Sequence, residues 1–177
     1  MSRVVIELTE DEQARMIEWC KKVQADKQAR NSIDKRVDKR FSSFDIMLLG
    51  LCGEYAICKH LGIPYNFRRW DEQGKGDVTH NGYEIEVKTN KYRDDLLKIP
   101  EWQVDCPADI YVLAQQLYRL KLFEILGYAT RETFRALRYK KTFPGYEDKP
   151  MFVMDYLDLE RPEYFRSALL LQRGAQC

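Results

Sequence analysis

Apolar residues recur at helical spacing near the start of the chain, just after a short apolar run at Val4 to Leu8. The stripe consists of Met16, Trp19 and Val23. Thr9 and Glu12 stand three residues apart, which is the spacing of a capping box that satisfies N–H groups at a helix start. The pattern predicts a short strand followed by a helix that runs to about Arg30.

The most apolar segment follows a serine pair and ends before Gly62 and Pro64. Ser42 or Ser43 is expected to cap a helix here, and Gly62 to stop it. Glu54 lies within it among apolar neighbours, so its carboxylate needs a partner. Two explanations of Glu54 that involve no function remain open: the helix turns its side chain outward, or an arginine pairs with it.

Alternating residues on either side of Asn81-Gly82 predict a β-hairpin, because Asn-Gly is the preferred two-residue turn between such strands. The register places Asp77 directly opposite Glu86, and Lys88 is on the same face two residues later. The apolar face of this hairpin consists of Val78, Tyr83, Ile85 and Val87.

Further apolar and capping patterns continue the alternation of strands and helices. Strands are expected at 109–116, 120–128 and 150–155, and helices at 131–138 and 161–172. The fold class is therefore α/β. No repeat or flexible linker interrupts the chain, so we expect one domain at 1–177.

The opposed carboxylates of Asp77 and Glu86 destabilise a hairpin unless a cation lies between them. Oxygen-only ligands favour Mg²⁺, with Mn²⁺ as a substitute, over Zn²⁺. Lys88 would bring an ammonium close to a reacting phosphate. The alternative is an exposed hairpin face that carries these charges with no function, and the geometry alone does not choose between the two.

In three motifs the chain resembles the PD-(D/E)XK, or restriction-endonuclease-like, nuclease superfamily. The motifs are Glu54 on an apolar helix, Gly76-Asp77 at the start of a hairpin, and Glu86-Val87-Lys88 on its second strand. The resemblance covers about residues 44–136. It implies an αβββαβ core with a mixed central sheet flanked by helices, in which 1–43 forms an N-terminal helical extension and 142–177 a C-terminal extension.

The resemblance also implies roles for these residues. Glu54, Asp77 and Glu86 would hold one or two Mg²⁺ ions, and Lys88 would complete the catalytic set. Gly76 stands where the family's name-giving proline is found. Glu84 is a rival to Glu86 but does not have the family spacing to Lys88, and Gln115 is a further residue that would contact the site from the next strand.

The distribution of charge along the chain indicates which residues would bind nucleic acid. The 177 residues contain 29 Lys and Arg against 28 Asp and Glu, a net charge of +1, which excludes a uniformly basic polyanion-coating protein. Local basic patches flank the acidic motifs, and Arg68 and Arg69 beside Trp70 are less specific candidates. The expected nucleic-acid-binding residues are Lys35, Arg36, Lys39, Arg40, Lys91, Arg93, Arg131 and Arg135.

Five cysteines without a CxxC pair indicate reduced thiols, so we expect a cytoplasmic protein. The longest uncharged apolar stretch has eight residues, too few to span a bilayer. We therefore expect no membrane partner.

The expected function is a Mg²⁺-dependent deoxyribonuclease, endonucleolytic and either structure-selective or weakly sequence-specific. DNA is favoured over RNA by the family resemblance only, and a homodimer remains open. The alternative is a non-catalytic nucleic-acid-binding or assembly module that keeps the nuclease fold. An RNA-processing nuclease is a third hypothesis.

Overall fold

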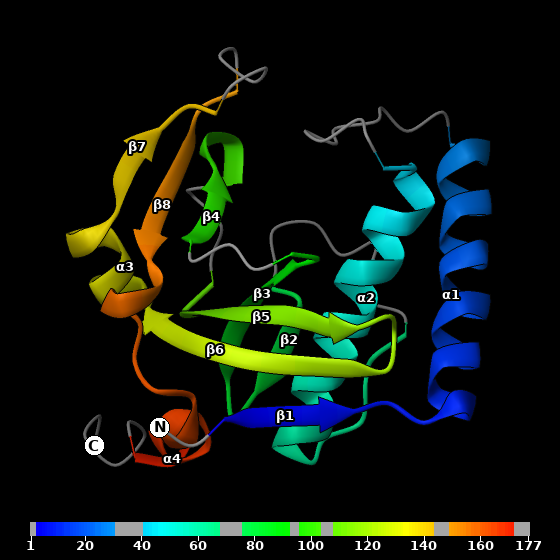
Figure 1. Ribbon diagram of the computed structural model, residues 1–177, viewed down its shortest axis with the longest axis horizontal. Coiled ribbons are helices and arrows are strands. Elements are labelled where there is room, and N and C mark those ends of the chain that lie inside the picture. Colours follow the sequence, from blue (N-terminus) through cyan, green and yellow to red (C-terminus); the bar gives the residue numbers. More distant parts are fainter. Residues whose placement is uncertain are drawn as a thin grey trace.

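The computed structural model of the chain describes residues 3–30, 41–67, 76–92, 96–103, 108–143 and 149–171. The fold is mixed α/β (Figure 1). Within these residues the α-helices are α1 (Glu10–Ala29), α2 (Ser43–Leu61), α3 (Arg131–Leu137) and α4 (Phe165–Leu171). The strands are β1 (Val4–Glu7), β2 (Val78–His80), β3 (Tyr83–Asn90), β4 (Leu96–Pro100), β5 (Ile110–Tyr118), β6 (Leu122–Thr130), β7 (Tyr139–Lys141) and β8 (Met151–Asp155). Short 3₁₀ turns are η2 (Glu101–Gln103), η3 (Tyr156–Asp158) and η4 (Pro162–Tyr164).

A five-stranded mixed sheet is the centre of the fold, with the order β1-β6-β5-β3-β2. Strands β3 and β5 run parallel, and the other neighbours in this sheet are antiparallel. A second sheet of three strands has the order β4-β8-β7. It rises from one end of the central sheet, while α1 and α2 stand at the other end (Figure 1).

The two faces of the central sheet are covered differently. Residues of α2 such as Leu51 and Ile57 share one buried cluster with Ile85 and Val112. On the opposite face, Leu113 is buried with Leu97 of β4, Met154 of β8 and Phe134 of α3. The expected mixed central sheet is confirmed, but helices alone do not flank it, because the small sheet covers much of the second face.

The sequence patterns located most of these elements. The predicted first helix, the apolar second helix, the hairpin and the two following strands with their helix are all present. Strands β4 (LLKIP) and β7 (YKK) are not among the predicted elements: β4 ends at a proline, and β7 has three residues, all exposed. The predicted C-terminal helix begins later than expected, because a 3₁₀ turn at Pro162–Tyr164 precedes α4.

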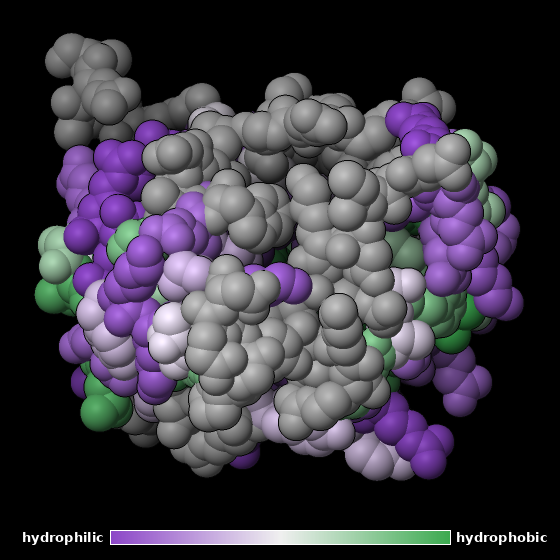
Figure 2. Space-filling view, turned by 90° about the horizontal axis from the view of Figure 1, so that it is seen from above, coloured by the Kyte–Doolittle hydropathy of each residue, from purple (hydrophilic) through white to green (hydrophobic). Residues whose placement is uncertain are grey.

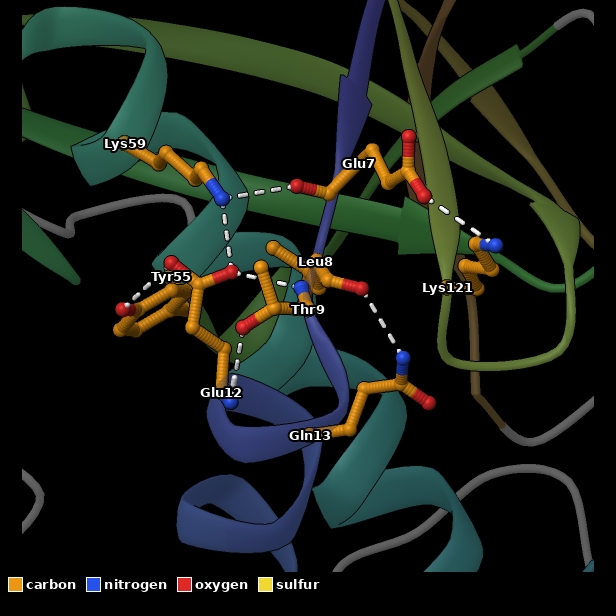
Figure 3. A network of polar contacts seen from close by, with 8 residues as sticks. All are labelled: Glu7, Leu8, Thr9, Glu12, Gln13, Tyr55, Lys59 and Lys121. Atoms are coloured by element: carbon orange, nitrogen blue, oxygen red, sulfur yellow. Dashed lines mark hydrogen bonds and ion pairs between the residues drawn. The ribbon is translucent and has the colours of Figure 1, made fainter.

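A polar network fixes how α2 lies against β1 and α1 (Figure 3). The capping box at Thr9 is formed in both directions, with Glu12 as its second member. Lys59 of α2 donates to the Glu7 carbonyl at 2.8 Å and to Glu12 at 2.7 Å. The hydroxyl of Tyr55 donates to Glu12 at 3.1 Å. The network therefore holds the helix that carries Glu54.

Hydrophilic residues gather at two sides of the face seen in Figure 2, toward β7 and α3 on one side and toward α1 on the other. On the first side Arg135, Lys140 and Lys141 are exposed. Among the described residues, no helix combines the length and the apolar character that a membrane crossing needs.

Candidate functional site

The hairpin of β2 and β3 has the predicted turn, and it has the predicted register as far as the pair Val78 and Ile85. Asn81 and Gly82 have φ values of 50° and 80°, as a two-residue turn of this kind requires. The ladder pairs His80 with Tyr83, Thr79 with Glu84, and Val78 with Ile85. These pairs confirm the predicted register of the two strands.

Asp77 departs from the prediction that it pairs directly with Glu86. The described ladder ends at Val78 and Ile85. Beyond that point Oδ2 of Asp77 accepts a hydrogen bond of 2.8 Å from the backbone N–H of Val87. The carboxylate thus satisfies a backbone donor of β3, and this contact fixes Asp77 beside the Glu86-Val87-Lys88 segment.

The glycine at the proline position of the motif has a physical reason. A Cβ on Gly76 would lie 2.8 Å from the carbonyl oxygen of Ile85 and 2.9 Å from its nitrogen, so a side chain there would collide with the backbone of β3. Its N–H donates to Oε2 of Glu84 at 3.2 Å, and proline has no such donor. The close approach of this segment to β3 therefore requires glycine.

Glu84, the rival to Glu86, is used by the hairpin itself. One of its carboxylate oxygens accepts from the N–H of Gly76, and the other accepts from the hydroxyl of Thr79 at 3.0 Å. These bonds fix the start of β2 against β3. The structure thus gives Glu84 a structural role.

Glu86 and Lys88 lie on the face of β3 that the small sheet covers, in register with Tyr111 and Leu113 of β5. Glu86 is only 4% exposed. The Lys88 Nζ lies 2.5 Å from Oε1 of Glu86 and donates to Oε1 of Gln103 at 2.9 Å. The ammonium of Lys88 is therefore held between the acidic residue of its own strand and η2.

Glu54 reaches the same region from α2. The helix approaches β3 so closely that a Cβ on Gly53 would lie 1.8 Å from the Thr89 hydroxyl oxygen. Oε2 of Glu54 accepts a hydrogen bond of 2.7 Å from the hydroxyl of Tyr65. The partner that a carboxylate in this helix needs is therefore a tyrosine, not an arginine.

The electrostatics of Glu54 show that the motif residues are neighbours in space. Desolvation raises the pKa of Glu54 well above its usual range, and the charges of Asp77 and Glu86 raise it further. The Tyr65 hydrogen bond and the Lys88 ammonium lower this pKa. Glu54, Asp77, Glu86 and Lys88 thus form one cluster, which we call the acidic cluster.

The charge and the donor atoms of this cluster fit a divalent cation. Carboxylate oxygens suit Mg²⁺, and a divalent ion would offset the repulsion by Asp77 and Glu86 that raises the pKa of Glu54. In the described part of the chain, however, no group of three or more His, Cys, Asp or Glu side chains is already gathered as a metal site. A bound cation would therefore require side-chain rearrangement.

Two contributors to this region have little signal in the sequence. Tyr65 follows the helix after Gly62 and Pro64, and only the need of Glu54 for a partner points toward it. Gln103 belongs to η2, after the unexpected strand β4, so its approach to Lys88 depends on a sheet that the pattern missed. Gln115 of β5 is buried. It lies in register with Asn90 of β3, and Asn90 comes two residues after Lys88.

The expected nucleic-acid-binding residues are only partly described. Arg135 on α3 is exposed, and so is Lys91 after β3. Arg131 donates to the Ala108 carbonyl at 2.7 Å and to Asp109 at 3.0 Å, so its guanidinium joins α3 to the start of β5. The residues outside the described part are Lys35, Arg36, Lys39, Arg40, Arg68, Arg69, Trp70 and Arg93.

In comparisons with known proteins, no family model, curated protein or solved structure matches this chain.

Proposed function

We propose that this protein is a metal-dependent nuclease that hydrolyses phosphodiester bonds in DNA. The observation that carries the proposal is the acidic cluster, in which an acidic residue from a helix meets the Asp and the Glu-x-Lys motif of a hairpin. This combination of three carboxylates and a lysine suits hydrolysis of a phosphodiester better than it suits a structural ion pair. A structural pair needs one carboxylate for the lysine, and the two further carboxylates raise the electrostatic energy of the site.

Each residue of the cluster would have a distinct task. Asp77 and Glu86 would hold the cation through oxygen atoms, and Glu54 would complete the set directly or through water. When bound, such a cation supplies charge neutralisation at the phosphate and a more acidic water. Lys88 would orient the attacking water and stabilise the negative charge that develops on the phosphate.

The hydrogen bonds of the cluster support these tasks, because they limit how far the side chains must move when a cation binds. Asp77 is bonded to the backbone of β3, Glu54 to Tyr65, and Lys88 to Gln103. Such contacts keep catalytic groups in a defined geometry.

The order of the secondary structure is compatible with the restriction-endonuclease-like core. α2 precedes the β2–β3 hairpin, and β5, β6 and α3 follow it. DNA as substrate rests on the family resemblance together with the exposed basic residues Lys91, Arg135 and Lys140. An endonuclease of weak sequence specificity or with a preference for DNA structure is the form we propose.

The test is cleavage of supercoiled, linear, single-stranded and branched DNA in Mg²⁺ or Mn²⁺, with matched RNA strands. We expect the wild type to cleave DNA, and Asp77→Asn, Glu86→Gln and Lys88→Ala to lose about 10²- to 10⁴-fold in rate. Lys22→Ala, an exposed lysine on α1, is the control and should cleave like the wild type. Circular dichroism checks that every variant folds. The proposal is wrong if the folded wild type cleaves no DNA with either ion, and RNA cleavage alone would support the RNA-processing hypothesis.

A second candidate is a non-catalytic nucleic-acid-binding or assembly module. It is favoured by the absence, among the residues that the structure describes, of a gathered three-residue metal group. This candidate predicts that Glu86→Gln and Lys88→Ala bind DNA as the wild type does and that no cleavage occurs. Binding and cleavage measured on the same samples therefore separate the two functions.

A further inference from the structure

An aromatic and cationic cluster lies just beyond the end of β3. Phe41 precedes α2, and Lys91 and Tyr92 follow β3 directly. The Lys91 Nζ lies 4.3 Å from the centre of the Phe41 ring and 5.7 Å from that of Tyr92. The two ring centres are 6.2 Å apart, and the rings are tilted by 42°. One ammonium thus lies beside two aromatic rings.

Phe41 and Lys91 border a cavity of about 180 Å³. Its apolar lining comes from α2 and the turn before β6, and its polar lining includes Asp45 and Gln116. The volume lies below the 300 to 1,000 Å³ of typical sites for drug-sized ligands. A flat ring fits such a site better than a whole cofactor, and the polar groups can bond to the edge of a nucleobase.

Tyr92 is not part of the core. Its side chain is 65% exposed, so most of its ring is available to a partner. If the cluster served only to pack Lys91 over Phe41, a second ring in solvent would add little. An exposed ring beside a cation is what a stacking site for single-stranded nucleic acid requires, because bases stack on the ring and the ammonium meets the backbone.

Lys91 and Tyr92 also follow the last residue of the acidic cluster closely in the chain. Lys91 comes three residues after Lys88, so their Cα atoms lie at most about 11 Å apart. A short stretch of single-stranded nucleic acid spans such a distance. A strand with a phosphate near Lys88 can therefore reach Tyr92 with a base a few nucleotides away.

We propose that Phe41, Lys91 and Tyr92 form a platform that holds an unpaired base of single-stranded DNA, with the adjoining phosphate on Lys91. Duplex DNA does not offer this contact, because both faces of its bases are already stacked. The proposal rests on the proposed nuclease function and deepens it, since it makes a single-stranded segment the preferred substrate.

The test measures binding of a labelled single-stranded oligonucleotide, its duplex and the matched RNA by fluorescence anisotropy in EDTA. We expect Tyr92→Ala to weaken single-strand binding roughly 5- to 150-fold and to leave duplex binding unchanged. Tyr92→Phe keeps the ring and should bind like the wild type. Lys91→Gln should lower the slope of log affinity against log salt by about 0.7. Tyr164→Ala, which removes another exposed tyrosine, is the control.

Unchanged single-strand binding by Tyr92→Ala would overturn the platform, even if the cleavage assay succeeds. Absence of single-strand binding by the wild type, or an equal loss with Tyr164→Ala, would also overturn it. Tighter binding of the RNA would overturn DNA as the ligand. If the wild type does not cleave but binding depends on the Tyr92 ring as expected, the platform is supported and the nuclease function alone fails.

Discussion

The hydroxyl of Tyr65 donates a hydrogen bond of 2.7 Å to Oε2 of Glu54. Desolvation and two neighbouring carboxylates raise the pKa of Glu54, and the hydrogen bond from Tyr65 lowers it. This bond therefore favours the charged form of Glu54. Tyr65 itself packs against two other rings, Tyr55 at 5.9 Å and Phe67 at 5.0 Å between centres. An aromatic cluster thus supports the hydroxyl that bonds to an acidic residue of the proposed active site.

Tyr65→Phe should impair the proposed reaction without unfolding the protein. The change removes the hydroxyl and keeps the ring, and loss of a partner that orients a metal-ligating carboxylate lowers metal affinity or activity by about 10- to 100-fold. The apparent pKa of the acidic limb of the pH–rate profile should rise, because the lost bond favoured the charged form of Glu54. Tyr55→Phe is the control, since its hydroxyl bonds to Glu12 instead. An unshifted pH profile in Tyr65→Phe would contradict this role.

Glu54→Gln should make the protein more stable and less active. A carboxyl group whose pKa is raised in the folded state releases its proton more easily when unfolded. The free energy of unfolding therefore falls as pH rises from 4.5, the usual pKa of glutamate, to the raised pKa. Glutamine removes this dependence, and we expect a gain of about 1 to 2 kcal/mol at neutral pH. Urea unfolding of both proteins across this pH range measures the effect. If the wild type is as stable as the variant over the whole pH range, then Glu54 does not lie in a desolvated position beside other carboxylates.

Gly53→Ala should destabilise the protein, whereas Gly50→Ala on the same helix should not. A Cβ at Gly53 would lie 1.8 Å from the Thr89 hydroxyl oxygen, and at Gly50 it would meet nothing within 4 Å. Crowding at Gly53 should lower the free energy of unfolding by about 1 to 3 kcal/mol, and Gly50→Ala should raise it by up to about 1 kcal/mol. Thermal unfolding compares the two.

A double variant tests whether the clash with Thr89 causes the lower stability of Gly53→Ala. Thr89→Ala removes the atom nearest to the added Cβ, so it should partly restore the stability of Gly53→Ala. If Gly53→Ala is as stable as Gly50→Ala, then α2 does not approach β3 as closely as the structure shows, and the position of Glu54 would need revision.

The hairpin and the long helices follow directly from local sequence. Asn81-Gly82 fixes a turn, the alternation on both sides fixes the register, and Thr9 and Ser42 begin helices with side-chain caps. These features depend on residues close together in the chain, so the pattern is sufficient to predict them.

The contacts between distant segments were not predictable in the same way. Gln103 approaches Lys88 because β4 joins a second sheet with β8, a pairing between segments far apart in the chain. Asp77 accepts from the N–H of Val87, and Gly76 lies against the backbone of β3. Such details depend on three-dimensional packing.

The most direct test of the central claim is a titration of the folded protein with Mn²⁺, followed by electron paramagnetic resonance of the free ion. If Glu54, Asp77 and Glu86 form one divalent-cation site, the wild type binds Mn²⁺, Mg²⁺ competes for the same site, and Asp77→Asn and Glu86→Gln each lose this binding. Thr79→Ala is the control. It removes a hydroxyl that donates to Glu84 and should retain Mn²⁺ binding. Mn²⁺ binding that is the same in the wild type and both carboxylate variants, or absent from all of them, would contradict the claim.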